Sequence, residues 1–373
     1  MEKIRSHENH IFCALVIYLI VTSFINQDLY AFTTVYASLI VFIVLTVMAV
    51  PYAAEGIRRK ERELLAALAT PVLALVFALV SRSGMGAVLI PSDLALICYV
   101  AGHLKLTKKD ATVIAFAGAA PVILWYSHVR WSYNFNMAGF VFMLTAFFAM
   151  ILTEQMEMEH RKAIRGMIYI TSFLISTLYH SRTAMYGLIV FGILYGLSDI
   201  MLIKKRVYQA VFLLASAGAA VFTMVYIHMS QAVKNLSVLN KEIFSGREDI
   251  WQELWEALSG MPLTGIGSRY VLKSFEIFEV HNGMFDILAV HGALIFLLIL
   301  VQLWWLFMKR YPGSGKKEST TAAERIALCA ALAMMFTSYF ENFFIVPPYS
   351  ILFMAFMVMA DTGRDGTQGA DSR

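Results

Sequence analysis

Arg247 is the first residue whose type and position indicate chemistry. It lies in the stretch SGREDIW, where Ser245 and Glu248 fit the capping-box pattern that begins a helix. A cation in the first turn adds to the partial positive charge of the helix N-terminus, and the two together attract an anion. The sequence therefore indicates an anion-binding arginine. The simpler alternative, which packing statistics alone favour, is a side chain that only reaches toward water.

Arg182 and His281 are the other candidates for chemistry. Arg182 lies in YHSRTAMYG, where a cation near hydrocarbon is costly enough to require a partner. His281 lies in EVHNGMFDIL, and an imidazole there can take up and release a proton near neutral pH. Gly265 and Gly267 in MPLTGIGS permit close backbone approach to a ligand, although a GxG is more often only a turn. A structural role is the simpler alternative for each of these residues.

Other polar residues are interpreted as structural. Three ionisable residues lie in or beside late apolar segments, where they can serve interhelical hydrogen bonds: Asp286, His291 and Glu341. All three cysteines lie within apolar segments: Cys13, Cys98 and Cys329. We therefore expect no disulfide, no metal site and no cofactor.

The elements that must position these residues are membrane helices. A hydrophobic share of 59%, a charged share of 15% and a mean hydropathy of +0.66 exclude a soluble globular protein. Apolar runs of about 17 to 25 residues recur, and each can cross a hydrocarbon core of about 30 Å as a helix. We predict an all-α polytopic bundle, a single domain over 1–373, of about twelve spans, the fourth and fifth broken by Pro91 and Pro121. The spans lie near 11–26, 30–54, 64–80, 86–102, 111–127, 137–153, 164–180, 183–203, 207–229, 284–308, 322–340 and 343–360.

The basic residues predict the orientation of this bundle. With Lys3 and Arg5 inside, 22 of the 30 Lys and Arg fall in inside turns and eight outside. Both termini are then cytoplasmic, 230–283 forms a large extracytoplasmic loop, and 361–373 is a disordered cytoplasmic tail. The basic turns meet anionic lipid, and nucleic acid is not an expected partner.

The outer loop contains a short amphipathic helix in this prediction. Its apolar side can lie along the membrane surface, where Trp is favoured, or pack on the bundle. This side consists of Ile250, Trp251, Leu254, Trp255 and Leu258.

The order of these motifs resembles the O-antigen ligase and O-antigen polymerase superfamily of bacterial membrane glycosyltransferases. The resemblance covers roughly 165–345 and rests on HSRTAMYGL, SGREDIW, PLTGIGS and VHNGMFDILAVHGALIFLLIL. It implies that Arg182 and Arg247 bind the diphosphate of an undecaprenyl-linked glycan donor. It also implies that His281 assists attack by the hydroxyl of an acceptor glycan, while Asn282 orients the histidine or a sugar.

The resemblance further implies metal-independent chemistry, because two arginines and a helix N-terminus can stabilise a diphosphate leaving group. It places the protein in the bacterial inner membrane with its active site on the extracytoplasmic side. The lipid bilayer and other membrane proteins of polysaccharide assembly are the remaining expected partners.

Several activities stay open at this point. Some polymerases carry Arg-x10-Gly segments, whereas Arg247 and Gly260 are separated here by twelve residues and Arg182 and Gly192 by nine. We favour a polymerase over a ligase that acts on a lipopolysaccharide core, because the modest outer loop leaves little acceptor-specific surface. A lipid-linked glycan transporter, or flippase, and a noncatalytic assembly protein are the alternatives from other classes.

Overall fold

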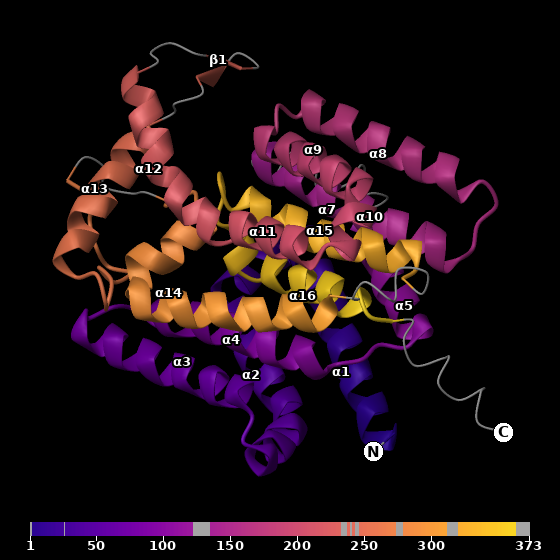
Figure 1. The fold of residues 1–373 in the computed structure, drawn as a ribbon, viewed down its shortest axis with the longest axis horizontal. Coiled ribbons are helices and arrows are strands. Elements are labelled where there is room, and N and C mark those ends of the chain that lie inside the picture. The colour runs from indigo at the N-terminus through magenta and orange to yellow at the C-terminus, as the bar shows by residue number, and fades with distance from the viewer. Residues whose placement is uncertain are drawn as a thin grey trace.

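The computed structural model describes residues 2–25, 27–121, 135–232, 237–238, 241–242, 246–273, 279–311 and 320–362. The chain is almost wholly helical in these parts, so the predicted all-α class is confirmed (Figure 1). Two strands of two residues each, β1 (Ser237–Val238) and β2 (Lys241–Glu242), pair antiparallel.

The helices before residue 200 form the first half of the bundle. They are α1 (Glu2–Ile20) with the π-helical turn η1 (Val21–Ile25), α2 (Gln27–Arg59), α3 (Arg62–Val80), α4 (Gly86–His103), α5 (Lys108–Ala119), α7 (Phe135–Gln155), α8 (Arg161–Leu178) and α9 (Arg182–Gly196). Pro91 was expected to break a span, but it lies inside α4, which continues through it.

The second half contains shorter and bent helices. They are α10 (Ser198–Ile203), α11 (Lys205–Ala215), α12 (Ala217–Ala232), α13 (Arg247–Gly260), α14 (Gly283–Arg310), α15 (Ala322–Thr337), the 3-10 turn η3 (Phe343–Ile345) and α16 (Tyr349–Met359). Local signals explain some of their ends. Thr321 and Glu324 form a reciprocal capping box that begins α15.

Six helices in the described residues are long and apolar enough to cross a membrane, or seven if the bent pair α11 and α12 counts as one span. The predicted count of about twelve and the predicted outer loop are therefore not confirmed. Each predicted span does correspond to helix, but several of these helices are short. An α-helix of 11 or 16 residues, such as α16 or α15, extends only about 16 or 24 Å, less than a hydrocarbon core.

The centre of the bundle is built from α15 and α16, which other helices surround (Figure 1). Every residue of α16 is buried, and so are most residues of α15. A helix that is apolar on all sides is expected in such a place. A polar side chain at the end of α15 is therefore well shielded from water.

The helices at the periphery show the opposite pattern. Large apolar side chains of α2 and α3 are exposed, among them Val47, Leu65 and Leu79. Apolar side chains exposed in such numbers along whole helices are characteristic of contact with lipid. The chain is therefore a membrane protein, and the exposed charges of these two helices lie at the turn that joins them.

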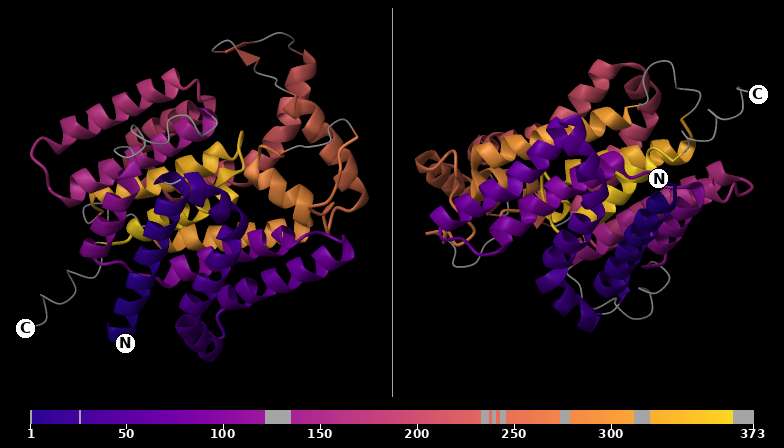
Figure 2. Two further views of the ribbon diagram at one scale, coloured as in Figure 1. Left: turned by 180° about the vertical axis from the view of Figure 1, so that it is seen from behind. Right: turned by 90° about the horizontal axis from the view of Figure 1, so that it is seen from below.

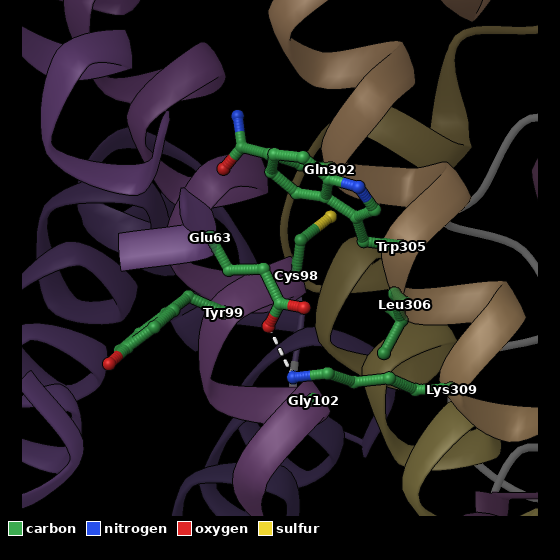
Figure 3. Close-up of a pocket in the computed structure, with 8 residues that line it drawn as sticks. All are labelled: Glu63, Cys98, Tyr99, Gly102, Gln302, Trp305, Leu306 and Lys309. Atoms are coloured by element: carbon green, nitrogen blue, oxygen red, sulfur yellow. Dashed lines mark hydrogen bonds and ion pairs between the residues drawn. The ribbon is translucent and has the colours of Figure 1, made fainter. Parts of the chain in front are cut away.

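One small polar cavity lies between α3, α4 and α14, where Lys309 reaches across to Glu63 (Figure 3). Its volume is about 10 Å³. A single water molecule needs about that much space, so this cavity cannot hold a substrate. Candidates for chemistry lie elsewhere.

Candidate functional site

Glu341 is the centre of the candidate site. This carboxylate follows α15, and its side chain is only 5% exposed. Oε1 lies 3.2 Å from Nη2 of Arg247, and Oε2 lies 3.2 Å from Nδ1 of His281. Thr183 at the start of α9 donates a weaker hydrogen bond of 3.4 Å to Oε1. One buried carboxylate thus joins three distant parts of the chain.

Helix α13 brings Arg247 to this carboxylate. The helix begins at Arg247, as predicted, but its N-cap is Gly246 in the left-handed conformation with φ 82°. Ser245, the predicted cap, lies outside the described residues. The predicted capping box of Ser245 with Glu248 therefore stays a prediction.

The apolar side of α13 packs on the bundle. Ile250, Trp251, Leu254 and Leu258 are buried, and Trp255 donates a 2.9 Å hydrogen bond to Thr223 of α12. This confirms packing, rather than a position along the membrane surface, for the apolar side of the helix. Arg247 does not reach for water either, because its side chain pairs with Glu341 and is only 14% exposed.

A tryptophan links Arg247 to His281. Nε1 of Trp251 donates a 2.6 Å hydrogen bond to the carbonyl of Val280. Arg247 and Trp251 are four residues apart, so they lie on the same face of α13. The face that holds the backbone next to His281 therefore also presents Arg247 to the site.

His281 lies just before α14 in the left-handed region, with φ 51°. That conformation costs a residue with a side chain roughly 1 to 2 kcal/mol, so the surroundings must hold it. The N–H of Gly283 lies 3.2 Å from the carbonyls of both Ser338 and Glu341, which fixes the turn. The His281 side chain is 31% exposed and thus accessible to a ligand.

Asn282 has a positioning role in this geometry. Its side chain is fully buried, and Oδ1 accepts a 2.8 Å bond from the N–H of Phe285 as the N-cap of α14. Nδ2 donates a 2.8 Å bond to the carbonyl of Ala219. These contacts orient the backbone that carries His281. A direct contact of Asn282 with substrate stays a prediction.

Arg182 is the first residue of α9, next to Thr183. Burial lowers the pKa of its guanidinium, and the positive charge of Arg247 lowers that pKa further, while Tyr226 and Glu341 act in the opposite direction. These electrostatic effects require the groups to lie close together. Arg182 therefore lies within electrostatic range of Arg247 and Glu341. A second, more exposed carboxylate, Glu279, lies 3.8 Å from Nδ1 of His281, so the cations of this site face two carboxylates.

Gly265 and Gly267 serve a different contact. Both have positive φ, 75° and 79°, and they pack on α14 where that helix is kinked at Gly292. A Cβ on Gly265 would lie 2.4 Å from the carbonyl oxygen of Val290. Val290 is eight residues beyond Asn282, or about 12 Å along the helix. The close approach of Gly265 is thus to another backbone, whereas a Cβ on Gly267 would meet the side chains of Ser81 and Ser83. A contact of these glycines with substrate stays a prediction.

Three polar residues were interpreted from the sequence as structural, and the structure supports this interpretation for two of them. Asp286 accepts a hydrogen bond from Asn342, and His291 bonds to the backbone of Ala87. The third residue, Glu341, also makes interhelical contacts, but its partners are the two main candidates for chemistry. Sequence reasoning missed this role. A glutamate in an apolar segment was the available signal.

The described residues include no group of three or more His, Cys, Asp or Glu side chains that could hold a metal ion. All three cysteines are buried and unpaired by disulfides: Cys13, Cys98 and Cys329.

Fold and site together define a helical membrane protein with a buried, cationic site that contains a histidine. Residues 167–300 match the family described as O-antigen ligase, which confirms the resemblance to the O-antigen ligase and polymerase superfamily. The matched part of the chain is therefore similar to membrane proteins of the ligase or polymerase type. The match includes Arg182, Arg247 and His281 and ends before Glu341. No curated protein and no solved structure matched the chain.

Proposed function

We propose that the protein transfers a glycan from undecaprenyl diphosphate to a sugar hydroxyl of an acceptor, without a metal ion. The observation that carries this proposal is the single carboxylate of Glu341 between Arg247 and His281, with Arg182 beside it. The site contains an anion-binding part and a proton-accepting part in contact. Both are needed to move a sugar from a diphosphate to a hydroxyl.

The arginines hold the diphosphate of the donor in this proposal. The guanidinium groups of Arg182 and Arg247 supply two positive charges for a diphosphate to contact, and Glu341 holds one of them in place. Each charge-assisted hydrogen bond from an arginine to phosphate contributes on the order of 1.5 to 3 kcal/mol. The same bonds stabilise the charge on the diphosphate as it leaves.

His281 accepts the proton of the acceptor hydroxyl. A carboxylate only accepts hydrogen bonds, so Nδ1 of His281 donates to Glu341 and Nε2 is left as the basic nitrogen. The acceptor oxygen attacks the anomeric carbon of the donor while its proton moves to Nε2. The bond between that carbon and the diphosphate oxygen breaks, and the diphosphate leaves with the electron pair.

The acceptor decides between polymerase and ligase. We favour a polymerase, which joins the glycan to a second lipid-linked glycan, because the chain offers little acceptor-specific surface. A ligase that acts on a lipopolysaccharide core is the second candidate, since the matched family is described as O-antigen ligase.

The test is to incubate the purified protein with a lipid-linked oligosaccharide, with and without lipopolysaccharide core. Longer lipid-linked glycan with released lipid diphosphate supports a polymerase, and transfer to the core supports a ligase. Transbilayer movement of unchanged glycan would identify a flippase and overturn the proposal. No change in any assay would favour a noncatalytic assembly role. The inactive control is His281→Ala, checked to be folded.

A further inference from the structure

A groove between α8 and α9 lies away from the candidate site. It encloses about 290 Å³ and is lined on the α8 side by Lys162, Arg165, Gly166 and Tyr169. These four residues recur at helical spacing, so they form one stripe of α8. Tyr195 of α9 also lines this α8–α9 groove. From Arg182 to Tyr195 the helix rises about 20 Å, so the groove belongs to the other end of α9.

Two glycines shape the groove. A Cβ built on Gly166 meets nothing within 4 Å, so this position leaves open space on α8. Gly192 of α9 makes room for the ring of Tyr169, whose hydroxyl donates a 2.9 Å bond to the carbonyl of Leu188. A Cβ on Gly192 would lie 2.6 Å from that hydroxyl. Apolar side chains complete the lining: Met150, Phe191 and Ile326.

The rim of the groove is basic. Nη1 of Arg165 lies 2.9 Å from both Oε1 of Glu154 and the hydroxyl of Tyr195, and Arg161 lies 3.6 Å from the same carboxylate. With Lys162 there are three positive charges against one negative, a local excess of two. Lys162 has no ion-pair partner within the part of the chain that the structure describes.

The groove lies on a part of α8 that combines a basic end with exposed apolar residues, the combination expected where lipid headgroups meet acyl chains. Helix α8 lies at the periphery of the bundle (Figures 1 and 2), and its apolar residues Met167, Ile170 and Leu174 are exposed. From Lys162 to Tyr169 the groove extends about 10 Å along the helix. The interfacial layer on each side of a bilayer is about 5 to 8 Å thick. A charged rim above an apolar floor therefore matches the depth of this boundary.

We propose that the α8–α9 groove binds an anionic phospholipid. The phosphodiester contacts Lys162 and Nη2 of Arg165, since the hydrogen bonds of Arg165 to Glu154 and Tyr195 use Nη1 and its guanidinium lies over the Tyr195 ring. One acyl chain lies over Gly166 on the apolar floor. This site is separate from the glycosyltransferase site, and its occupant is a lipid of the surrounding bilayer rather than the substrate.

The test uses the delipidated full chain in detergent, titrated with phosphatidylglycerol or phosphatidylcholine. Native mass spectrometry measures retained lipid, and the thermal midpoint Tm measures stabilisation. Lys162→Gln removes the rim charge, and Gly166→Leu fills the floor without meeting other atoms. The matched controls are Lys109→Gln, an exposed lysine of α5, and Gly86→Leu, a helical glycine that also has open space around it.

We expect phosphatidylglycerol to be retained more tightly than phosphatidylcholine and to raise Tm in the wild type and in both controls. Lys162→Gln should weaken retention about fivefold, as expected for loss of one lysine near an anionic lipid. Gly166→Leu should abolish the rise in Tm that phosphatidylglycerol produces in the wild type. Equal effects of the two lipids on the wild type would overturn the proposal whatever the variants do. Retention of undecaprenyl phosphate but not phosphatidylglycerol would also overturn it, because the groove would then bind the donor lipid.

Discussion

Two buried arginines at opposite ends of α14 differ in what surrounds them. Arg310, at the end of the helix, is 3% exposed and donates to Asp361 and to the carbonyls of Ala101 and Leu104. Arg247, packed near the start of α14, donates to Glu341 alone among the described residues and lies beside a second arginine. Both arginines pair with a carboxylate, so an ion pair alone does not distinguish a functional site from a contact that only stabilises the fold.

The difference lies in the charge balance and in the accessibility of the neighbours. Arg310 is surrounded by acceptors that belong to the protein. Its hydrogen bonds join α14 to the end of α4 and to the residues after α16. Arg247 shares its carboxylate with a partly exposed histidine and lies within electrostatic range of a second arginine. A buried arginine therefore indicates function when the protein leaves part of its charge for a ligand. The four predictions below test this comparison.

Loss of the structural arginine should have the largest effect. Arg310→Leu leaves Asp361 and two carbonyls without their donor, and breaking a buried pair on one side costs about 3 to 5 kcal/mol. We expect a large fall in the free energy of unfolding and little change in turnover per folded molecule. Chemical denaturation measures the first quantity and a glycan-transfer assay the second. Arg325→Leu, which breaks the more exposed pair with Asp199, is the control and should cost no more than about 1 kcal/mol.

His281→Ala should lower turnover about 100-fold or more, since general-base catalysis contributes about 10² to 10⁴. Binding of the lipid-linked donor should change little, because the histidine acts on the acceptor. Steady-state kcat and a donor-binding assay separate the two quantities. His228→Ala, an exposed histidine of α12, is the control. Turnover of folded His281→Ala within about fivefold of wild type would leave only a positioning role for the imidazole.

Arg247→Ala should weaken donor binding and turnover together. One lost charge-assisted bond of about 1.5 to 3 kcal/mol corresponds to a roughly 10- to 150-fold loss in kcat/KM. The control is Arg269→Ala, which removes an exposed cation from the segment between α13 and α14. Equal losses in both variants would mean that overall charge, and not the contact at Glu341, attracts the donor.

The sequence predicted the class of the fold and the main polar residues of the site. Hydropathy identified the helical segments correctly, because apolar runs must be helical in lipid. The predicted number of spans is not confirmed, because a run such as 343–360 contains the short helices η3 and α16 around Pro347 and Pro348. Hydropathy records composition and cannot show where a helix ends within an apolar run.

Glu341 could not be assigned from the sequence, although Arg182, Arg247 and His281 could. Its partners lie 60 and 94 residues away, and only the packing of α13 against α12 and α14, and of α14 against η3, brings them together. For the glycines of PLTGIGS the sequence suggested a ligand contact, whereas the structure shows contacts with other parts of the chain. Their positive φ was expected, but φ does not tell whether a ligand or another backbone occupies the space beside them.

The substitution with the smallest expected effect is Glu341→Gln. It best distinguishes the role of the Glu341 carboxylate from that of Asp361. Glu341→Gln keeps the size of the side chain but removes its charge and replaces one of its two acceptor oxygens with an NH2 donor. Arg247 then no longer has a carboxylate that competes with phosphate, so we expect the donor to bind as tightly as in wild type or more tightly. Turnover should fall about tenfold. Loss of a partner that orients a histidine typically costs about 10- to 100-fold, and this is the lower end of that range.

This combination of tighter binding and slower turnover is not expected from general damage, which would weaken both. Binding of inorganic pyrophosphate, measured with folded protein, gives a second readout that does not depend on the acceptor. Asp361→Asn is the matched control at the other buried pair and should change stability without changing pyrophosphate affinity. If Glu341→Gln bound pyrophosphate more weakly than wild type, the carboxylate would be supporting the arginine instead of competing for it. The two buried pairs would then differ only in position.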